Sequence, residues 1–561
     1  MRGLILAALA ADLAVLVYLN ALPHPFVYDD LVGVVGNPAL VDGAGPLEVV
    51  RQNVFRPVVN LSFALDHALW GFRPVGYHLT SVLLHALNVA LLFVLARRLA
   101  VDWRGGDAET GREPDVVAFV AASLFAVHPM MSEAVGYVSG RADVLATSFV
   151  LLALLALRAG LERPAWRAAG VGLALLGAAT KEVAVVLPVL VLAWDRCLLD
   201  GDPAARRRRL LRWHLPFLGA AVALGLARAT SFLLIERSTT SAAAWPYLQT
   251  QLGVVWRYVR LLLIPVGQSI VHAVPIASAR VDAGAVIAAL ALLVATALGW
   301  RLRRHQPLPV FGGLWFLVGL APTAAVALYD PMAERRVYLA SAGFFLALAA
   351  GAGRLWSRSG APARRVGLAA FVLVVAGLAT LTVQRNRVWG DAVTLWSDAA
   401  AKSPGAFAAH YGLANALGER GRCHEALPEY EAALRLARRP EIYTNQGVCL
   451  AAEHRLSEAA AAFEEAVTLD PDNTLAHHNL GLVALRAGDF EAAHRHFLKA
   501  VTTHARDAGW RQTLIRIYEL EIRDPAKTLE LCRAIVRVAG RETPGAEACL
   551  ERYEHRARRS P

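Results

Sequence analysis

Long apolar runs follow one another through the first two thirds of the chain and stop near Val383. About eleven of these runs have the roughly 17 to 25 residues that one helix needs to cross a bilayer. The predicted spans lie near residues 4–22, 76–96, 116–134, 144–160, 166–180, 183–200, 213–234, 283–300, 308–328, 338–356 and 366–383. The segment Tyr247–Ile264 is also apolar but carries Arg257 and Arg260, so we expect an interfacial or re-entrant helix there, on the outer side.

A different pattern, with a period of about 34 residues, follows the apolar runs. Three copies align on small and aromatic residues, namely Ala426-Tyr430-Ala433, Ala459-Phe463-Ala466 and Ala493-Phe497-Ala500. This spacing is typical of tetratricopeptide repeats, in which small residues let two helices pack closely while the aromatic ring fills the gap to the next repeat. A weaker fourth copy covers about 507–539, and 543–556 predicts the terminal capping helix that such solenoids need.

These patterns predict an all-α protein with two different parts. Residues 1–384 form a multi-span membrane helical bundle whose first outer loop, 23–75, is long. Residues 385–403 form a linking helix, and 404–561 form the repeat α-solenoid.

Composition and charge support this division and predict an orientation. Of the 561 residues, 56% are hydrophobic and only 18% are charged, which is too apolar for a wholly soluble chain. The net charge of +11 comes mostly from arginines in short loops on one side of the spans, where the positive-inside rule explains them better than nucleic-acid binding does. That side is the cytoplasm, so we expect a cytoplasmic N-terminus, an uncleaved first span and a repeat domain outside the inner membrane.

The five cysteines show neither CxxC nor zinc-ligand spacing. From the residues we therefore predict neither a metal site nor a disulfide framework. No motif demands a divalent ion, although some proteins of related fold use one.

Charged and polar residues gather at the outward ends of the predicted spans. Asp29 and Asp30 follow the first span directly. An isolated polar residue at an interface usually snorkels or pairs with a neighbour, but acids and bases on several outer loops together indicate a substrate path or catalytic site. The supporting candidates are His78, His85, His128, Glu133, Asp143 and Glu182.

One chemistry that suits this arrangement is group transfer from a lipid-linked donor, although periodicity alone does not point to a sugar. A carboxylate such as Asp29 or Asp30 can take the proton of an acceptor hydroxyl as that oxygen attacks a sugar carbon. The departing phosphate needs cations and donors. The candidates for that role are Arg56, Arg141, Lys181, Arg335, Arg336 and Tyr338.

An ordered set of motifs then resembles transmembrane and tetratricopeptide-repeat-containing mannosyltransferases. The set comprises Phe26–Asp30, Asn37–Pro38, Phe55–Phe63, Gly76–Asn88, Leu124–Pro129, Glu133–Val135, Ser139–Asp143 and Lys181–Glu182, with Leu187–Pro188 and Asp195. The resemblance implies a GT-C glycosyltransferase fold, a polyprenyl- or dolichyl-phosphate sugar as donor and an inverting mechanism. It also implies that an acid of the first outer loop is the base, Asp29 first and Asp30 second. The Arg- and Ala-rich composition points to a bacterial member.

The repeats predict a concave surface for an acceptor or partner protein. Asn415, Asn445 and Asn479 recur on first helices, where their amides could hold an extended peptide or simply be solvated. Two alternatives stay open. One is an O-antigen-ligase-like or polymerase-like enzyme, which the position of the long loop disfavours. The other is a membrane-anchored scaffold, which the charges on separate outer loops disfavour.

Overall fold

The computed structural model describes residues 1–43, 45–52, 56–104, 112–199, 202–235, 243–278, 280–328, 330–504, 508–540 and 545–557. Within these ranges all regular secondary structure is helical, as the sequence predicts. The chain divides into two compact units, Met1–Asp398 and Ala399–Pro561. The first is called the membrane unit here and the second the repeat unit.

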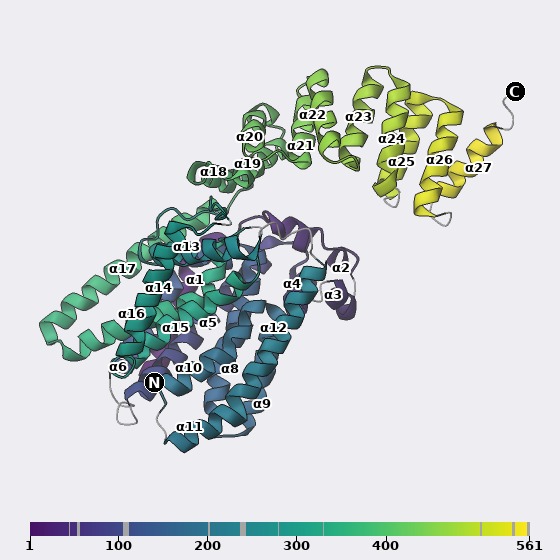
Figure 1. The fold of residues 1–561 in the computed structure, drawn as a ribbon. Coiled ribbons are helices and arrows are strands. Elements are labelled where there is room, and N and C mark those ends of the chain that lie inside the picture. The colour runs from purple at the N-terminus through teal and green to yellow at the C-terminus, as the bar shows by residue number, and fades with distance from the viewer. Residues whose placement is uncertain are drawn as a thin grey trace. The chain divides into compact units, whose positions relative to one another are not determined.

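The membrane unit is a bundle of long helices joined by shorter helical turns (Figure 1). Its helices are α1 (Arg2–Tyr18), α2 (Pro38–Val41), α3 (Pro46–Gln52), α4 (Pro57–Trp70), α5 (Pro74–Arg104), α6 (Glu113–Val127), α7 (Ser132–Val135), α8 (Arg141–Ala159), α9 (Ala165–Thr180), α10 (Leu187–Cys197), α11 (Pro203–Arg209), α12 (Leu215–Ile235), α13 (Ala244–Leu263), α14 (Ala283–Leu302), α15 (Pro307–Ala325), α16 (Tyr338–Arg358) and α17 (Ala361–Val388). The short turns that matter for the site are η2 (Leu31–Val35), η4 (Pro129–Met131), η5 (Val138–Gly140), η6 (Glu182–Val186) and η8 (Glu334–Val337).

Each of the eleven predicted spans overlaps at least one helix of the described residues, but fewer helices are long enough to cross a bilayer. In the described residues eight helices have the required length and hydropathy, and a ninth is counted if the pair Glu113–Val127 and Pro129–Val135, bent by 57°, forms one span. The predicted spans 166–180 and 183–200 correspond to α9, with 16 residues, and α10, with 11. The helical backbone is interrupted between α9 and α10, because the polar residue Lys181 has an extended conformation.

The core of the membrane unit lies between α1, α5, α6, α8, α15 and α16, and it consists mainly of Ala, Val, Leu and Phe side chains. Gly312 of α15 and Gly343 of α16 let two of these helices approach closely. A Cβ on Gly312 would lie 2.5 Å from the carbonyl oxygen of Gly343. The amphipathic α13 is not among the helices that qualify as spans, as expected for Tyr247–Ile264.

The first outer loop folds into short helices that pack on the ends of the long ones. A small apolar cluster joins Val34 and Leu40 of the loop with Val59 and Phe63 of α4, with Tyr77 of α5, and with Val138 and Ala142. This cluster fixes the loop against the start of α8, which is where the candidate site lies.

The repeat unit consists of helix pairs that follow one another in order (Figure 1). The preceding helix α18 (Ala392–Lys402) crosses the boundary between the units. The repeat helices are α19 (Phe407–Glu419), α20 (Cys423–Leu436), α21 (Pro440–Ala452), α22 (Leu456–Leu469), α23 (Thr474–Arg486), α24 (Phe490–His504), α25 (Ala508–Ile517), the turn η9 (Tyr518–Ile522), α26 (Pro525–Ala539) and α27 (Ala546–Ala557).

The aromatic rings, which the sequence pattern predicts in the gap to the next repeat, pack against a glycine of the first helix in their own repeat. A Cβ on Gly447 would lie 2.5 Å from the ring of Phe463, and a Cβ on Gly481 would lie 2.5 Å from the ring of Phe497. Tyr430, Phe463 and Phe497 are all buried.

The prediction that the chain has no disulfide framework is wrong. Cys423 at the start of α20 pairs with Cys449 of α21, and Cys532 of α26 pairs with Cys549 of α27. The partners are 26 and 17 residues apart in sequence, so only the packing of neighbouring helices brings them together. Cys197 of the membrane unit is a free thiol.

Candidate active site

The two adjacent aspartates of the first outer loop have opposite environments. Tyr28 has a left-handed backbone, with φ +55°, and this sharp turn sends the next two side chains in different directions. Asp30 is fully buried, and its carboxylate accepts hydrogen bonds from Ser139 N at 2.7 Å, Ser139 Oγ at 2.6 Å and Val27 N at 3.3 Å. Asp29 is exposed, and its backbone N–H donates to the Tyr137 hydroxyl at 3.1 Å.

Burial decides the electrostatics of Asp30. Removal from water raises the pKa of the Asp30 carboxyl from 3.8 to about 6, despite the three hydrogen bonds that favour its ionised form. Burial also raises the pKa of the neighbouring Tyr137 hydroxyl, and the negative charge of Asp29 raises it further. Tyr137 therefore stays neutral beside the two aspartates. Asp30 fastens the loop, whereas Asp29 is the carboxylate that an acceptor could reach.

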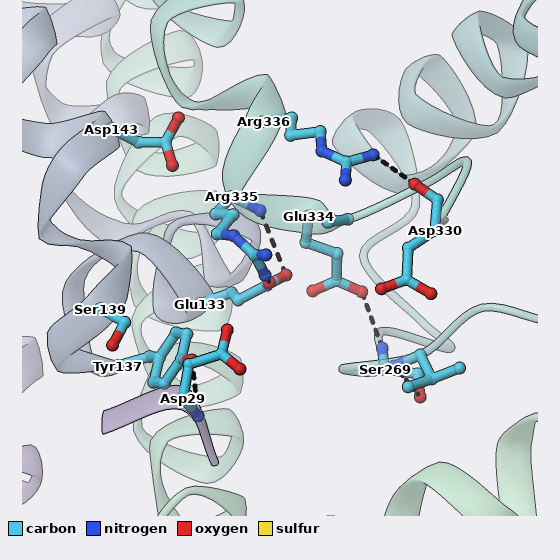
Figure 2. Close-up of polar contacts among 12 residues, drawn as sticks. Asp29, Glu133, Tyr137, Ser139, Asp143, Ser269, Asp330, Glu334, Arg335 and Arg336 are labelled. Atoms are coloured by element: carbon cyan, nitrogen blue, oxygen red, sulfur yellow. Dashed lines mark hydrogen bonds and ion pairs between the residues drawn. The ribbon is translucent and has the colours of Figure 1, made fainter. Parts of the chain in front are cut away.

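An ion pair lies near Asp29, with a buried Glu133 carboxylate and an Arg335 side chain that is 22% exposed (Figure 2). The Arg335 guanidinium of η8 bonds to the Glu133 carboxylate of α7, and Arg335 N donates to the same carboxylate at 3.1 Å. The two residues come from segments 202 positions apart in the sequence. Their pairing joins the two outer turns and holds Arg335 in place, because both oxygens of Glu133 are engaged.

Arg336 differs from Arg335 in its partners. One of its guanidinium nitrogens donates to the backbone carbonyl of Asp330 at 2.6 Å (Figure 2). Among the ion pairs of the described residues, Arg336 has no carboxylate within bonding distance, so its charge is not neutralised by direct contact. Burial raises the pKa of the Asp330 carboxyl, while Arg336 and Arg335 act in the opposite direction. Asp330 is thus a second carboxylate beside these arginines.

The other cations proposed from sequence are paired with acids. Lys181 Nζ lies 2.5 Å from Asp143, and Arg56 lies 3.9 Å from Glu182. Both cations therefore have their partner acids on the predicted outer loops. Each pair also ties one outer turn to another segment, and the predicted residues Asp143 and Glu182 serve as the counter-charges.

Arg141 is the predicted phosphate ligand whose position fits that role least. It is fully buried, lies 2.6 Å from Asp66 of α4 and donates to the Tyr77 carbonyl at 2.6 Å. Its guanidinium also lies over the Phe63 ring. This geometry makes Arg141 the clamp that holds α4 on α5 and α8, and a phosphate could reach it only after that clamp opened.

The predicted histidines and Tyr338 cross-link helices in the interior. His85 is hydrogen-bonded to the Tyr338 hydroxyl at 2.7 Å and to the Ala126 carbonyl at 3.2 Å. His78 and His128 each bond to a distant backbone carbonyl, that of His24 and that of Leu262. Through these contacts the histidines and Tyr338 link neighbouring helices of the bundle.

Several residues of the site were not singled out from the sequence. They are Tyr137, Asp330 and the buried pair of Glu334 with His272, and the Glu334 carboxylate also accepts a hydrogen bond from Ser269 N at 2.7 Å. Tyr28 stood inside the motif Phe26–Asp30, but no pattern indicated its left-handed turn. Ser139 stood inside a quoted motif, but no pattern linked it to Asp30. Within the described residues no group of three or more His, Cys, Asp or Glu side chains is arranged to hold a metal ion.

In the repeat unit, two of the three predicted asparagines bind each other. Asn445 Nδ2 donates to Asn415 Oδ1 at 3.0 Å and to the Tyr411 hydroxyl at 3.0 Å, while the Tyr430 hydroxyl donates to Asn415 at 2.8 Å. This network bridges the first and second repeats. Asn479 is half-buried on α23.

Comparison with known proteins agrees with the expected resemblance. Residues 411–474 and 450–517 match two models described as tetratricopeptide repeat. The chain is 24% identical over 452 residues to the "Protein O-mannosyl-transferase F38B6.6" of Caenorhabditis elegans, covering 76% of this chain and 62% of that protein. It is 27% identical over 504 residues to the human "Protein O-mannosyl-transferase TMTC1", covering 77% of this chain and 55% of that protein.

A shorter match is closer in sequence. The "Protein O-mannosyl-transferase Tmtc1" of Drosophila melanogaster is 36% identical over 177 residues, which is 29% of this chain and 19% of the relative. A solved structure titled "YrrB: a TPR protein with an unusual peptide-binding site" covers 33% of this chain and 89% of its own, at 18% identity and a TM-score of 0.23, which is too low to support an argument.

The chain spans less than two thirds of the length of these curated relatives. It has several helices that are long and apolar enough to cross a membrane, and two stretches that match tetratricopeptide-repeat models. The chain is therefore a multi-pass membrane protein with tetratricopeptide repeats that is similar, over about three quarters of its length, to protein O-mannosyl-transferases.

Proposed function

We propose that this protein is a membrane glycosyltransferase that moves a sugar, mannose or another hexose, from a polyprenyl-phosphate donor to an acceptor hydroxyl. The transfer takes place at the outer face of the membrane that the protein spans. The observation that carries the proposal is the environment of Asp29. An exposed carboxylate lies beside the Arg335–Glu133 pair, in a chain similar to O-mannosyl-transferases.

Asp29 is the general base of the proposed reaction. The acceptor hydroxyl oxygen attacks the anomeric carbon of the donor sugar, and the hydroxyl proton passes to the Asp29 carboxylate. The bond between that carbon and the phosphate oxygen breaks, and its electron pair leaves with the polyprenyl phosphate. Attack from the face opposite the phosphate inverts the anomeric configuration. Asp30 is less suited to this role because its carboxylate is enclosed by Ser139 and Val27.

Arg336 stabilises the departing phosphate in this proposal. A guanidinium that bonds only to a carbonyl in the described residues keeps donors free for the phosphate oxygens, and such charge-assisted contacts are strong. Arg335 adds positive potential, while Glu133 fixes its orientation. Lys181 and Arg56 are further cations of the outer loops, each held by an acid.

We further propose that the outer loops and the repeat unit face the extracytoplasmic side of the inner membrane. The arginine-rich loops favour this orientation. The two cystine pairs of the repeat unit support it independently, because disulfides persist in oxidising compartments and are rare in the cytosol. On that side the repeats would recruit the acceptor protein or another partner, since stacked repeats offer an extended concave surface.

The test is incubation of the purified protein with a panel of polyprenyl-phosphate sugars, including mannose, followed by measurement of released polyprenyl phosphate. A polyprenyl-diphosphate sugar serves as the comparison donor. The proposal predicts release from a monophosphate donor and loss of that release in the Asp29→Asn variant. Release from the diphosphate donor alone would favour a ligase-like enzyme, and no release from any donor would favour a scaffold.

A further inference from the structure

The chain between the last long helix and the repeats packs against the candidate catalytic loop. α17 ends at Val388, and α18 begins three residues after Trp389. Trp389 and Trp396 are both buried within the membrane unit. An ion pair between Arg385 of α17 and Asp398 of α18, at 2.7 Å, fixes the angle between the two helices.

Four aromatic rings continue from this corner to Asp29. Trp396 meets the Tyr28 ring edge-on, with centroids 5.3 Å apart. Tyr28 is stacked on Tyr137 at 6.2 Å, and Tyr137 is stacked on Trp389 at 5.3 Å. Two rings of the catalytic region therefore lie between two tryptophans of the connecting segment.

The backbone at Tyr28 needs external support. A large side chain with φ +55° occupies a sparsely populated backbone conformation, and such residues persist only where the surroundings hold them. The Tyr28 side chain is 38% exposed, so burial of the ring alone does not hold it. The backbone bond from Asp30 N to the Val27 carbonyl, 3.1 Å, closes the turn, and the ring contacts with Trp396 and Tyr137 hold the Tyr28 side chain that this turn carries.

The same turn decides where Asp29 points. Tyr28 immediately precedes Asp29, and the Asp29 N–H donates to the Tyr137 hydroxyl on the ring that Tyr28 stacks against. If Tyr28 relaxed to an ordinary backbone conformation, the Asp29 amide and carboxylate would both turn away from their present positions. Asp30 would be affected less, because Ser139 holds it from the other side.

We propose that Trp396 is a positioning residue for the candidate base, holding the Tyr28 ring and, through it, the left-handed turn that presents Asp29. This inference rests on the proposed function for what Asp29 does, but the positioning itself does not depend on it. In this proposal α18 does more than connect the membrane unit to the repeats. The helix that leads into the repeats therefore also supports the catalytic loop.

Hydrogen exchange of the full-length protein in detergent micelles tests the positioning without any substrate. Trp396→Ala should remove the protection of the Asp29 amide, whereas Trp396→Phe, which keeps a ring, should retain most of it. The control is Trp356→Ala on α16, whose ring lies by Arg364 and about 27 Å along the helix from its start, at 1.5 Å per residue. Unchanged protection at Asp29 in the Trp396→Ala variant would overturn the proposal.

A second variant covers the case in which Trp396→Ala fails to fold. Tyr28→Ala removes the same ring contact from the exposed loop, so it should also expose the Asp29 amide, and Tyr28→Phe should not. In the assay for polyprenyl phosphate release, both alanine variants should lower kcat by about 10²-fold, the usual cost of misplacing a reacting group by about 1 Å. The KM for the donor should stay unchanged, because the phosphate ligands are not touched.

The two proposals fail in different ways. If the wild-type protein releases no polyprenyl phosphate, the proposed function is wrong, while the exchange data still report whether Trp396 positions Asp29. If the wild type is active and Tyr28→Ala keeps its kcat, the positioning inference is wrong and the proposed function stands.

Discussion

Ser139→Ala should lower the stability of the folded protein by an amount that depends on pH. The change removes the hydroxyl that donates to Asp30 at 2.6 Å and leaves the backbone N–H donor at 2.7 Å in place. A hydrogen bond to a charged group contributes about 1.5 to 3 kcal/mol, and one between neutral groups about 0.5 to 1.5 kcal/mol. The loss should therefore be larger when Asp30 is ionised than when it is protonated.

The pKa of Asp30 defines the pH window. Because its folded pKa, about 6, lies above the ordinary value of 3.8, the native state binds the proton more tightly than the unfolded chain does. Its contribution to stability is full below about pH 4 and is lost as pH rises through about 6, a difference of about 3 kcal/mol at 1.36 kcal/mol per unit. Ser139→Ala should enlarge this loss by about 1 kcal/mol, raising the pKa of Asp30 further.

The measurement is thermal unfolding of the wild type and the variant in detergent micelles at about pH 8 and about pH 5. We expect Ser139→Ala to lower stability by about 2 kcal/mol at the higher pH and by about 1 kcal/mol at the lower pH. Ser148→Ala is the matched control, because its hydroxyl donates only to the Val144 carbonyl of its own helix. Equal losses at both pH values would refute a role for Ser139 in holding an ionised Asp30.

Three further predictions concern the repeats, the topology and the donor. In the isolated repeat unit, which we expect to fold as a soluble helical domain, Phe463→Ala should cost about 3 to 5 kcal/mol because that ring is buried against Gly447. The exposed Phe490→Ala should change stability little, and equal melting points for the two variants would contradict the repeat packing. An impermeant maleimide applied to intact cells should label the four repeat cysteines only after their disulfides are reduced. It should label Cys197, which the proposed orientation places on the cytoplasmic side, only after the membrane is permeabilised. Labelling of Cys197 in intact cells would contradict the orientation. Arg336→Ala should lower kcat/KM for the donor, because its guanidinium is proposed to bind the departing phosphate, and an unchanged kcat/KM would exclude that contact.

The sequence predicts the helices well because their patterns are local. Apolar runs locate every long helix of the membrane unit, and the alternation of small and aromatic residues locates the repeat pairs. The number of spans is less certain from sequence, since the break at Lys181 turns two apolar runs into short helices. The mean hydropathy of an apolar run does not show where the backbone becomes extended.

The site is only partly predictable because its contacts are long-range. Adjacency in the sequence makes Asp29 and Asp30 look equivalent, and only the turn at Tyr28 buries one and exposes the other. Arg141 looks like a phosphate ligand until its partner Asp66, 75 positions earlier, is seen. The cystines were missed for the same reason, because their spacing reflects the packing of repeat helices rather than a cysteine motif.

The central claim is that Asp29 accepts the proton of the acceptor, and one rate measurement tests it most directly. Asp29→Asn keeps the size of the side chain but removes its basicity, while Asp42→Asn changes another exposed acid of the same loop and serves as the control. Initial rates of polyprenyl phosphate release should fall by about 10² to 10⁴ in Asp29→Asn, with donor binding retained, and should stay at the wild-type level in Asp42→Asn. A wild-type rate in the Asp29→Asn variant would contradict the account.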